Sequence, residues 1–201
     1  MSKKIILSLV TIIAVSAIAI GGTVAYFSDT ETSTGNTFTA GTLDLNLDGA
    51  NINVVKFTVT DANPGAVGGG TWILNNAGSI AGYLDVESIS LVDADNNCTE
   101  PELATPDATC GPADGGELSA NMTVDLFVDV NNNGVNDAET VIYAGALNGI
   151  ATNYNLNLAL ASLGTNYVRL NYTVPTTVGN IIQSDSTTLN LTFELGQTIG
   201  Q

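Results

Sequence analysis

Apolar and polar residues alternate along much of this chain, and a period of two is the pattern of a β-strand that buries one face. The alternating segments cover residues 43–47, 55–59, 124–130, 155–160, 168–174 and 188–195. In the third of them, the pattern places Leu126 and Val128 inside and Phe127 and Asp129 on the outer face. Each segment is therefore predicted to be a strand with one buried face.

The alternation changes parity once, between residues 84–86 and 89–91, which predicts a β-bulge near Ser88. No segment after residue 25 has a clear period of 3.6, although 148–163 has room for a short helix. Turn-forming clusters separate the strands at residues 61–70, 75–78, 132–134 and 175–180. About eight short strands with this spacing predict an all-β fold, an antiparallel jelly-roll sandwich in one domain.

The first 25 residues differ from the rest of the chain. Lys3 and Lys4 precede an apolar run over residues 5–20, and Thr23 and Ala25 occupy the two positions before a cleavage point that must be small. This arrangement predicts a signal peptide over residues 1–25, removed by signal peptidase, and a secreted product. Two alternatives are a retained membrane anchor and a type IV pilin-like leader that is cut after Lys4.

Charge and composition exclude several classes of function. The chain has 20 acidic residues, four basic residues and no histidine, and beyond residue 25 its only basic residues are Lys56 and Arg169. A surface this acidic repels phosphate backbones, so nucleic acid is excluded as a partner. Without histidine there is no HExxH zinc helix and no Ser-His-Asp triad. We therefore expect no enzyme.

The two cysteines, Cys98 and Cys110, lie in one acidic stretch, residues 93–116. An even pair in a single loop of a secreted chain predicts a disulfide that closes the loop. Two free thiols are the alternative.

A polar loop near the middle of the chain resembles a calcium-binding loop. Oxygen ligands fall at its positions one, three, five and nine, and Gly134 is at position six. The acid expected at position twelve is out of register, because position twelve is Thr140. The alternative is a plain hairpin turn at Asn133-Gly134. If calcium binds, the candidate residues are Asp129, Asn131, Asn133, Val135, Asp137 and Glu139.

Other surface features are weaker signals. Four Asn-x-Ser/Thr sequons are candidate glycosylation sites: Asn97, Asn121, Asn171 and Asn190. About four such sequons would occur by chance in a chain of this composition, so their number is no evidence of glycosylation. Phe127, Tyr143 and Tyr167 are the aromatic residues that a carbohydrate-binding face would use, whereas Trp72 is expected in the core. A surface-displayed adhesion or carbohydrate-binding module is therefore an alternative function.

The segment that follows the leader, residues 26–37, is rich in threonine and serine and has no apolar face of its own. Such an arm can complete the open edge of a sandwich in another molecule, because the main chain supplies the hydrogen bonds. Repeated head to tail, this contact produces a filament. The alternative is a disordered tail.

Both ends of the chain resemble one protein family. The residues that carry the resemblance are 25–33, 36–45, 61–65, 70–79, 178–180, 183–185, 189–193 and Gln197. They are similar to the TasA/camelysin family of secreted matrix fibre proteins, whose archaeal relatives form bundling pili. Because residues 96–116 match nothing in the bacterial members, the insertion favours an archaeal, bundling pilin-like relative. Camelysin-type members have been described as metalloproteases, but the lack of histidine argues against that activity here.

The resemblance implies assembly by strand donation. The arm would be residues 26–38 and the jelly-roll domain residues 39–201, with a disulfide-closed insertion near 93–116. The implied donor strand is Tyr26, Phe27, Ser28, Asp29, Thr30, Glu31, Thr32, Ser33 and Thr34. We therefore expect a structural subunit of an extracellular filament at the cell surface, either a bundling pilus or a biofilm matrix fibre. The expected partners are other copies of the same chain, joined head to tail, and calcium is the only cofactor expected.

Overall fold

The computed structural model describes residues 2–21, 39–51, 62–97, 99–104, 110–111 and 115–200. The chain divides into two units, residues 1–39 and residues 40–201. The predicted strand over residues 55–59 lies outside the described residues.

The described residues of the N-terminal unit include the helix α1 (Lys3–Gly21). Apolar side chains between Ile5 and Val15 are exposed, and the hydroxyls of Thr11 and Ser16 donate to carbonyls four residues earlier. These bonds satisfy polar groups inside a helix that is otherwise apolar. Among the described residues, the structure has no helix whose length and apolarity suffice to cross a membrane. The cleaved leader remains a prediction.

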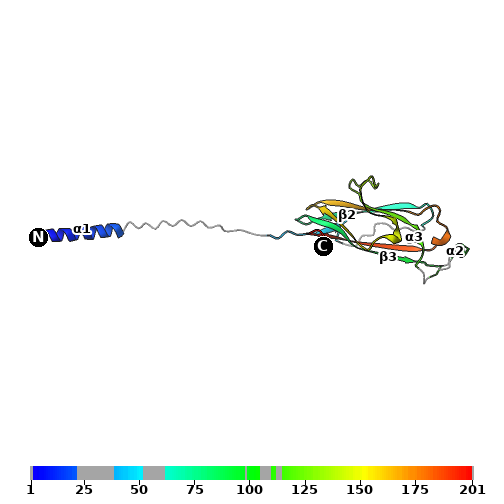
Figure 1. Ribbon diagram of the computed structural model, residues 1–201, viewed down its shortest axis with the longest axis horizontal. Coiled ribbons are helices and arrows are strands. Elements are labelled where there is room, and N and C mark those ends of the chain that lie inside the picture. Colours follow the sequence, from blue (N-terminus) through cyan, green and yellow to red (C-terminus); the bar gives the residue numbers. More distant parts are fainter. Residues whose placement is uncertain are drawn as a thin grey trace. The chain divides into compact units, whose positions relative to one another are not determined.

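The described residues of the second unit form two antiparallel sheets (Figure 1). The first has five strands in the order β1 (Leu45–Leu47), β2 (Val67–Asn76), β7 (Thr165–Thr173), β4 (Thr123–Val128) and β5 (Thr140–Ala146). The second has three strands in the order β6 (Tyr154–Leu160), β3 (Gly82–Ala94) and β8 (Ser186–Gly196). The prediction of an all-β antiparallel sandwich is confirmed, while the jelly-roll connectivity and the donor strand stay predictions.

In the described part of the second unit, four single helical turns lie between the strands, and the sequence pattern predicted none of them in these places. They are α2 (Glu100–Ala104), α3 (Leu118–Asn121) and the 3₁₀ turns η1 (Leu147–Gly149) and η2 (Asn180–Ile182). A helix of three to five residues is too short to show a period of 3.6, which is why the pattern missed them. Residues 148–163 contain the end of η1 and then β6 instead of an α-helix.

The core lies between the two sheets and is formed by the inward faces of the strands. The rings of Trp72 in β2 and Phe193 in β8 are 5.9 Å apart, so they join the sheets directly. Burying each large apolar side chain contributes about 1.5–3 kcal/mol. The buried cluster comprises Trp72, Leu74, Leu84, Leu118, Met122, Val124, Leu126, Leu147, Val168, Leu170, Val174 and Ile182.

The predicted bulge is confirmed, since the pairing of β3 with β8 shifts between Val86 and Ser88. The outward placement of Phe127 and Asp129 is wrong, because both are 0% exposed. The β4–β5 register shifts between Leu126 and Phe127, so the simple alternation fails at this point. Asp129 lies just beyond the end of β4, and its carboxylate accepts hydrogen bonds from the following loop.

Candidate metal centre

Three carboxylates meet at one end of the three-stranded sheet, two of them close together in the chain and the third far along it. Asp95 directly follows β3, Glu102 lies in α2, and Asp185 directly precedes β8. Ala94 and Ser186 are partners in the β3–β8 ladder, so the residues that flank this pair are brought together. One carboxylate oxygen of each acid lies within 4.8 Å of those of the other two.

Burial makes this arrangement electrostatically costly. Asp95 is 3% exposed and Glu102 is 1% exposed, while Asp185 is partly exposed. At the effective dielectric constant of a protein interior, two like charges this close repel by about 3 kcal/mol. In the described part of the sandwich the basic side chain is Arg169, which donates to Thr71 in the other sheet. No described basic side chain therefore neutralises the three acids.

Backbone N–H groups hold two of the carboxylates in place. Asp95 accepts from the N–H of Asn97 at 3.2 Å and from the N–H of Gly111. Glu102 accepts from the N–H of Thr99 at 2.6 Å through its Oε2 atom. These donors come from the insertion itself, so they fix the insertion around the two acids.

The third carboxylate, that of Asp185, has one satisfied and one unsatisfied oxygen. Its Oδ2 atom accepts from the N–H groups of Glu117 at 2.6 Å and Leu118 at 3.0 Å. Its Oδ1 atom is buried and has no hydrogen-bond partner. A buried acceptor without a donor is rare and needs an explanation, such as an ion.

The surroundings also change the acidity of Asp185. Burial raises the pKa of its carboxyl group above the usual range, and the nearby carboxylates of Asp95 and Glu102 raise it further. The N–H donors of Glu117 and Leu118 lower the pKa, but the net shift is upward. A positive charge close to this carboxyl group would oppose the upward shift of its pKa.

Gly116 packs against this carboxylate. Its φ is +68°, and a Cβ atom at this position would lie 3.0 Å from Cγ of Asp185 and 3.1 Å from the backbone of Ala94. Glycine adopts positive φ at little cost and has no side chain to fill this space. The close approach of the chain to Asp185 thus depends on glycine.

The loop predicted to bind calcium lies elsewhere, between β4 and β5. Oδ1 of Asp129 accepts from the N–H of Asn133 at 3.0 Å, and Oδ2 accepts from the N–H of Gly134 at 2.9 Å. Oδ1 of Asn131 accepts from the same Asn133 N–H, and Oδ1 of Asn133 accepts from the N–H of Val135. The first half of the loop is therefore closed by its own side chains.

The second half of the loop is closed in a similar way. The side-chain amides of Asn131 and Asn133 donate to Oδ2 of Asp137 at 3.2 and 3.3 Å. Oε1 of Glu139 accepts from the N–H of Val130 at 2.7 Å, and its Oε2 atom is buried without a partner. Among the described residues, the acids of this loop do not form a group of three within 4.8 Å.

The antiparallel pairing of β4 with β5 confirms that this loop is a hairpin connection. Whether it also binds calcium stays a prediction. The three-carboxylate cluster was missed from the sequence because four strands separate Asp95 from Asp185 along the chain. No local spacing marks such a cluster, and only the register of β3 with β8 reveals it.

Several other predicted sites fall partly or wholly outside the described residues. The donor segment over residues 26–34 and Cys98 are among these, so strand donation and the Cys98–Cys110 disulfide stay predictions. Of the sequons, Asn97 and Asn190 are exposed, whereas Asn121 and Asn171 are partly buried.

The side chain of Asn171 already has partners. It accepts from Nε of Arg169 at 2.8 Å and donates to the carbonyl of Gly134 at 3.2 Å. A glycan at Asn171 would disturb these bonds. An aromatic binding face is also not found at the predicted residues, because Phe127 is buried and Tyr143 and Tyr167 are partly buried.

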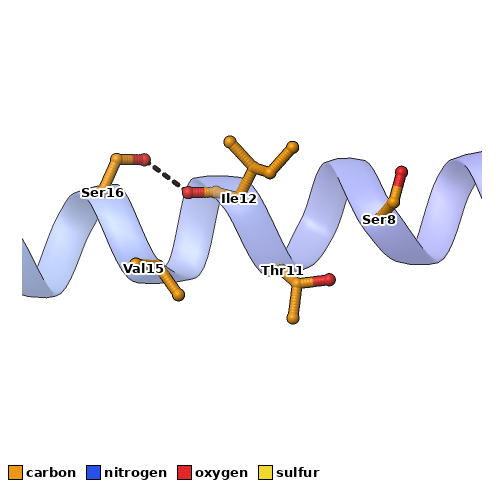
Figure 2. Close-up of a pocket in the computed structure, with 5 residues that line it drawn as sticks. All are labelled: Ser8, Thr11, Ile12, Val15 and Ser16. Atoms are coloured by element: carbon orange, nitrogen blue, oxygen red, sulfur yellow. Dashed lines mark hydrogen bonds between the residues drawn. The ribbon is translucent and has the colours of Figure 1, made fainter.

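A shallow hollow on α1 is lined by Ser8, Thr11, Ile12, Val15 and Ser16 (Figure 2). The hydroxyl of Ser16 donates to the carbonyl of Ile12 at 2.6 Å. All five residues belong to one exposed helix, so the hollow has no convergent polar groups from a second element. Its geometry does not correspond to a ligand pocket of an enzyme.

The fold and the cluster together define an antiparallel β-sandwich domain with an oxygen-only candidate site for a cation. The chain belongs to the camelysin family: the sequence profile described as camelysin metallo-endopeptidase matches residues 1–201. The resemblance to the TasA/camelysin family is thereby confirmed, and it makes this a protein of the secreted matrix fibre type in general. The match does not bear out the expectation, drawn from residues 96–116, that the chain is an archaeal, bundling pilin-like relative. No curated protein matches the chain.

The family name is that of an enzyme, whereas the TasA homologues are structural proteins. The name implies a metal ion, and the residues present fit only one kind of ion. Zinc in peptidases is held mainly by histidine, which this chain lacks. Three carboxylates with a buried, unpartnered oxygen fit a hard cation that prefers oxygen, such as Ca²⁺. Such an ion would neutralise charge at this site.

Proposed function

We propose that this chain is a structural subunit of an extracellular filament, a bundling pilus or biofilm matrix fibre, that polymerises by donor-strand complementation. The observation that carries the proposal is the full-length match to the TasA/camelysin family on an antiparallel β-sandwich. The arm of one subunit, residues 26–38, adds a strand to the sandwich of the next. Because the contact is head to tail, it repeats into a filament.

Edge strands of the sandwich support this proposal. In the described part of the chain, β1 and β5 are the outer strands of one sheet and β6 and β8 those of the other. β8 pairs with β3 from Ser186 to Gly196 and has no strand on its other side among these residues. An edge strand offers backbone N–H and C=O groups, which bind an extended segment largely independently of its side chains.

Charge also favours main-chain pairing as the mode of assembly. After removal of a leader over residues 1–25, twenty acids would remain against Lys56 and Arg169 alone. Subunits with this surface repel one another, and salt bridges between them are nearly impossible to form. Backbone hydrogen bonds do not depend on the sign of the side-chain charges.

A structural role explains the residues better than the peptidase activity in the family name. With no histidine, the chain lacks both the usual zinc ligands and an imidazole base. Its candidate cation site is built from carboxylates alone. We therefore assign the family's structural function to this chain and not the enzymatic one.

Proline substitutions in the arm test strand donation directly. Thr30→Pro combined with Thr32→Pro removes two backbone N–H groups, so the arm can no longer pair fully with a sheet edge. We expect secreted, folded protein that elutes as a monomer and forms no filaments in negative-stain electron microscopy. Deletion of residues 26–37 should give the same result.

The matched control is Thr30→Ala with Thr32→Ala, which keeps both N–H groups and should still form filaments. Filaments of normal appearance from the proline variant would show that this arm is not the donor. The same preparations, incubated with casein and Zn²⁺, should leave the casein intact. Cleavage that tracks with the purified protein would restore the enzymatic alternative.

A further inference from the structure

We propose that the outer face of the β3–β8 pair, over residues 88–94 of β3 and 186–192 of β8, packs against the same face of a second copy of this chain. We call this surface the neutral face. The inference rests on the proposed filament and goes beyond it, because it adds a lateral contact between filaments to the head-to-tail contact within one.

Strand pairing builds the neutral face from four cross-strand pairs. The ladder joins Ser88 to Thr192, Ser90 to Asn190, Val92 to Thr188 and Ala94 to Ser186. Seven of these eight side chains are exposed, and that of Ala94 is partly exposed. The pairs between them point into the sandwich, where Ile89 is buried and Leu189 and Leu191 pack against the core. Because side chains alternate between the two faces of a sheet, the eight lie together on one face.

The neutral face carries no charge, although 20 of the chain's 201 residues are acidic. Asp93 lies among these residues along β3, but it alternates to the opposite face, where its Oδ2 atom accepts from the hydroxyl of Ser119 at 2.6 Å. The next acids along the two strands lie beyond the ends of the neutral face: Glu87, Asp95, Asp185 and Glu194.

The outer face of the five-stranded sheet differs, because acidic residues lie on it and over it. The side-chain amide of Asn136 donates to Oδ2 of Asp125 in β4 at 2.9 Å, and the carbonyl of Gly134 accepts from the amide of Asn171 in β7 at 3.2 Å. These bonds hold the loop between β4 and β5 against this sheet, and the same loop exposes Asp137. Two copies that met through this sheet would bring their acidic loops together.

Charge and hydrogen-bonding capacity favour a second copy as the occupant of the neutral face. Two chains of formal net charge −16 repel each other, but within this face there is no carboxylate to meet another. Hydroxyl and amide side chains are both donors and acceptors, so two identical faces can hydrogen-bond to each other. Val92, which is 60% exposed, adds an apolar contact near the centre.

The neutral face is small, so a single contact of this kind is weak. Seven residues of a strand span roughly 23 Å, and neighbouring strands lie about 4.8 Å apart. A stable interface buries about 800 Å² on each partner, which is more than a strip of this size provides. Subunits arrayed along a filament present the face many times, and repeated weak contacts add up to stable association. We therefore expect filaments to associate side by side.

New charges on the neutral face test this contact. Thr188→Asp with Thr192→Asp changes two exposed side chains of β8. Purified wild-type filaments, kept in EGTA and about 150 mM NaCl, should lie side by side in negative-stain electron microscopy and sediment at low speed. Filaments of the variant should form normally but remain single, and the fraction that sediments should fall about tenfold, because facing copies then repel.

The matched control places the same two charges away from the neutral face. Thr140→Asp with Thr173→Asp changes exposed residues at the start of β5 and the end of β7. Its net charge equals that of the first variant, so general repulsion between filaments is the same. Its filaments should still associate side by side as the wild type does.

Crosslinking identifies the occupant as a second copy. Asn190→Cys places a thiol near the centre of the neutral face, and a short bifunctional maleimide should join two such chains into a dimer. The dimer yield should fall when Thr188→Asp and Thr192→Asp are added. Thr173→Cys, exposed on the other sheet, should give little dimer.

The possible failures are distinguishable. Side-by-side association that persists in Thr188→Asp with Thr192→Asp, or that is lost equally in the control, would overturn the neutral-face contact alone. A sugar found on Asn190 by mass spectrometry of the secreted protein would also overturn it, because a glycan would then cover the face. Absence of filaments from the wild type would contradict the proposed function, and the lateral contact would fall with it.

Discussion

Single residues show how strongly this fold depends on local backbone geometry. Gly116 adopts a φ of +68° directly beside the carboxylate of Asp185. Phe127 is fully buried at the point where the β4–β5 register shifts. Neither property follows from residue type, because glycine is common in this sequence and Phe127 lies on the polar side of its alternating segment.

Gly116→Ala should lower the free energy of unfolding by about 1–3 kcal/mol. The left-handed backbone conformation costs about 1–2 kcal/mol for alanine, and the new Cβ atom would press on Asp185 and Ala94. Urea unfolding followed by circular dichroism measures this loss. Gly179→Ala is the matched control, since no atom lies within 4 Å of a Cβ there and its φ is −80°. Equal stability of the two variants would contradict the role given to Gly116.

Among the elements, the loop between β4 and β5 is the one whose sequence and structure agree best. A hairpin turn at Asn133-Gly134 was the alternative to a calcium-binding loop, and β4 and β5 pair on either side of it. The structure adds that Asp129 holds the loop through two backbone N–H groups while it is itself 0% exposed. The loop is thus organised by its own hydrogen bonds.

Asp129→Ala should destabilise the protein by roughly 1–3 kcal/mol even in EGTA, because two backbone N–H groups lose a charged acceptor. Asp137→Ala should cost less, since Asp137 is exposed and accepts hydrogen bonds from the side-chain amides of Asn131 and Asn133. Chemical unfolding of both variants with and without Ca²⁺ provides the measurement. If Asp129→Ala is less stable than the wild type only in the presence of Ca²⁺, the loop is organised by the ion instead.

For the whole molecule, charge is the dominant property. The formal net charge is −16, and both lysines of the leader would be lost with residues 1–25. Subunits must therefore approach one another against electrostatic repulsion before any strand can pair. Repulsion of this kind is screened over about 10 Å at 0.1 M salt and over a shorter distance at higher salt.

Filament growth should therefore accelerate with ionic strength. Raising NaCl from about 10 mM to about 500 mM should shorten the lag in light scattering, because screening lowers repulsion without weakening backbone hydrogen bonds. The comparison is made in EGTA, so that divalent ions do not contribute. Slower assembly in high salt would indicate contacts between opposite charges, which is the reverse of what this composition predicts.

Much of the fold was predictable because it depends on local periodicity. The alternation in residues 124–130, 155–160, 168–174 and 188–195 corresponds to β4, β6, β7 and β8. The bulge near Ser88 was predictable for the same reason, since a parity change is visible in the sequence. The single helical turns could not be predicted, because they depend on how the chain returns to the sandwich and not on a repeating pattern.

The sequence by itself determined the all-β class, the acidic surface and the family, since alternation, composition and motif are all readable along the chain. Only the tertiary structure decided that Asp95, Glu102 and Asp185 meet at one site. Their meeting depends on the pairing of Ala94 with Ser186 and on the fold of the insertion between them. Contacts between residues so far apart in the chain are set by strand register, which local spacing does not encode.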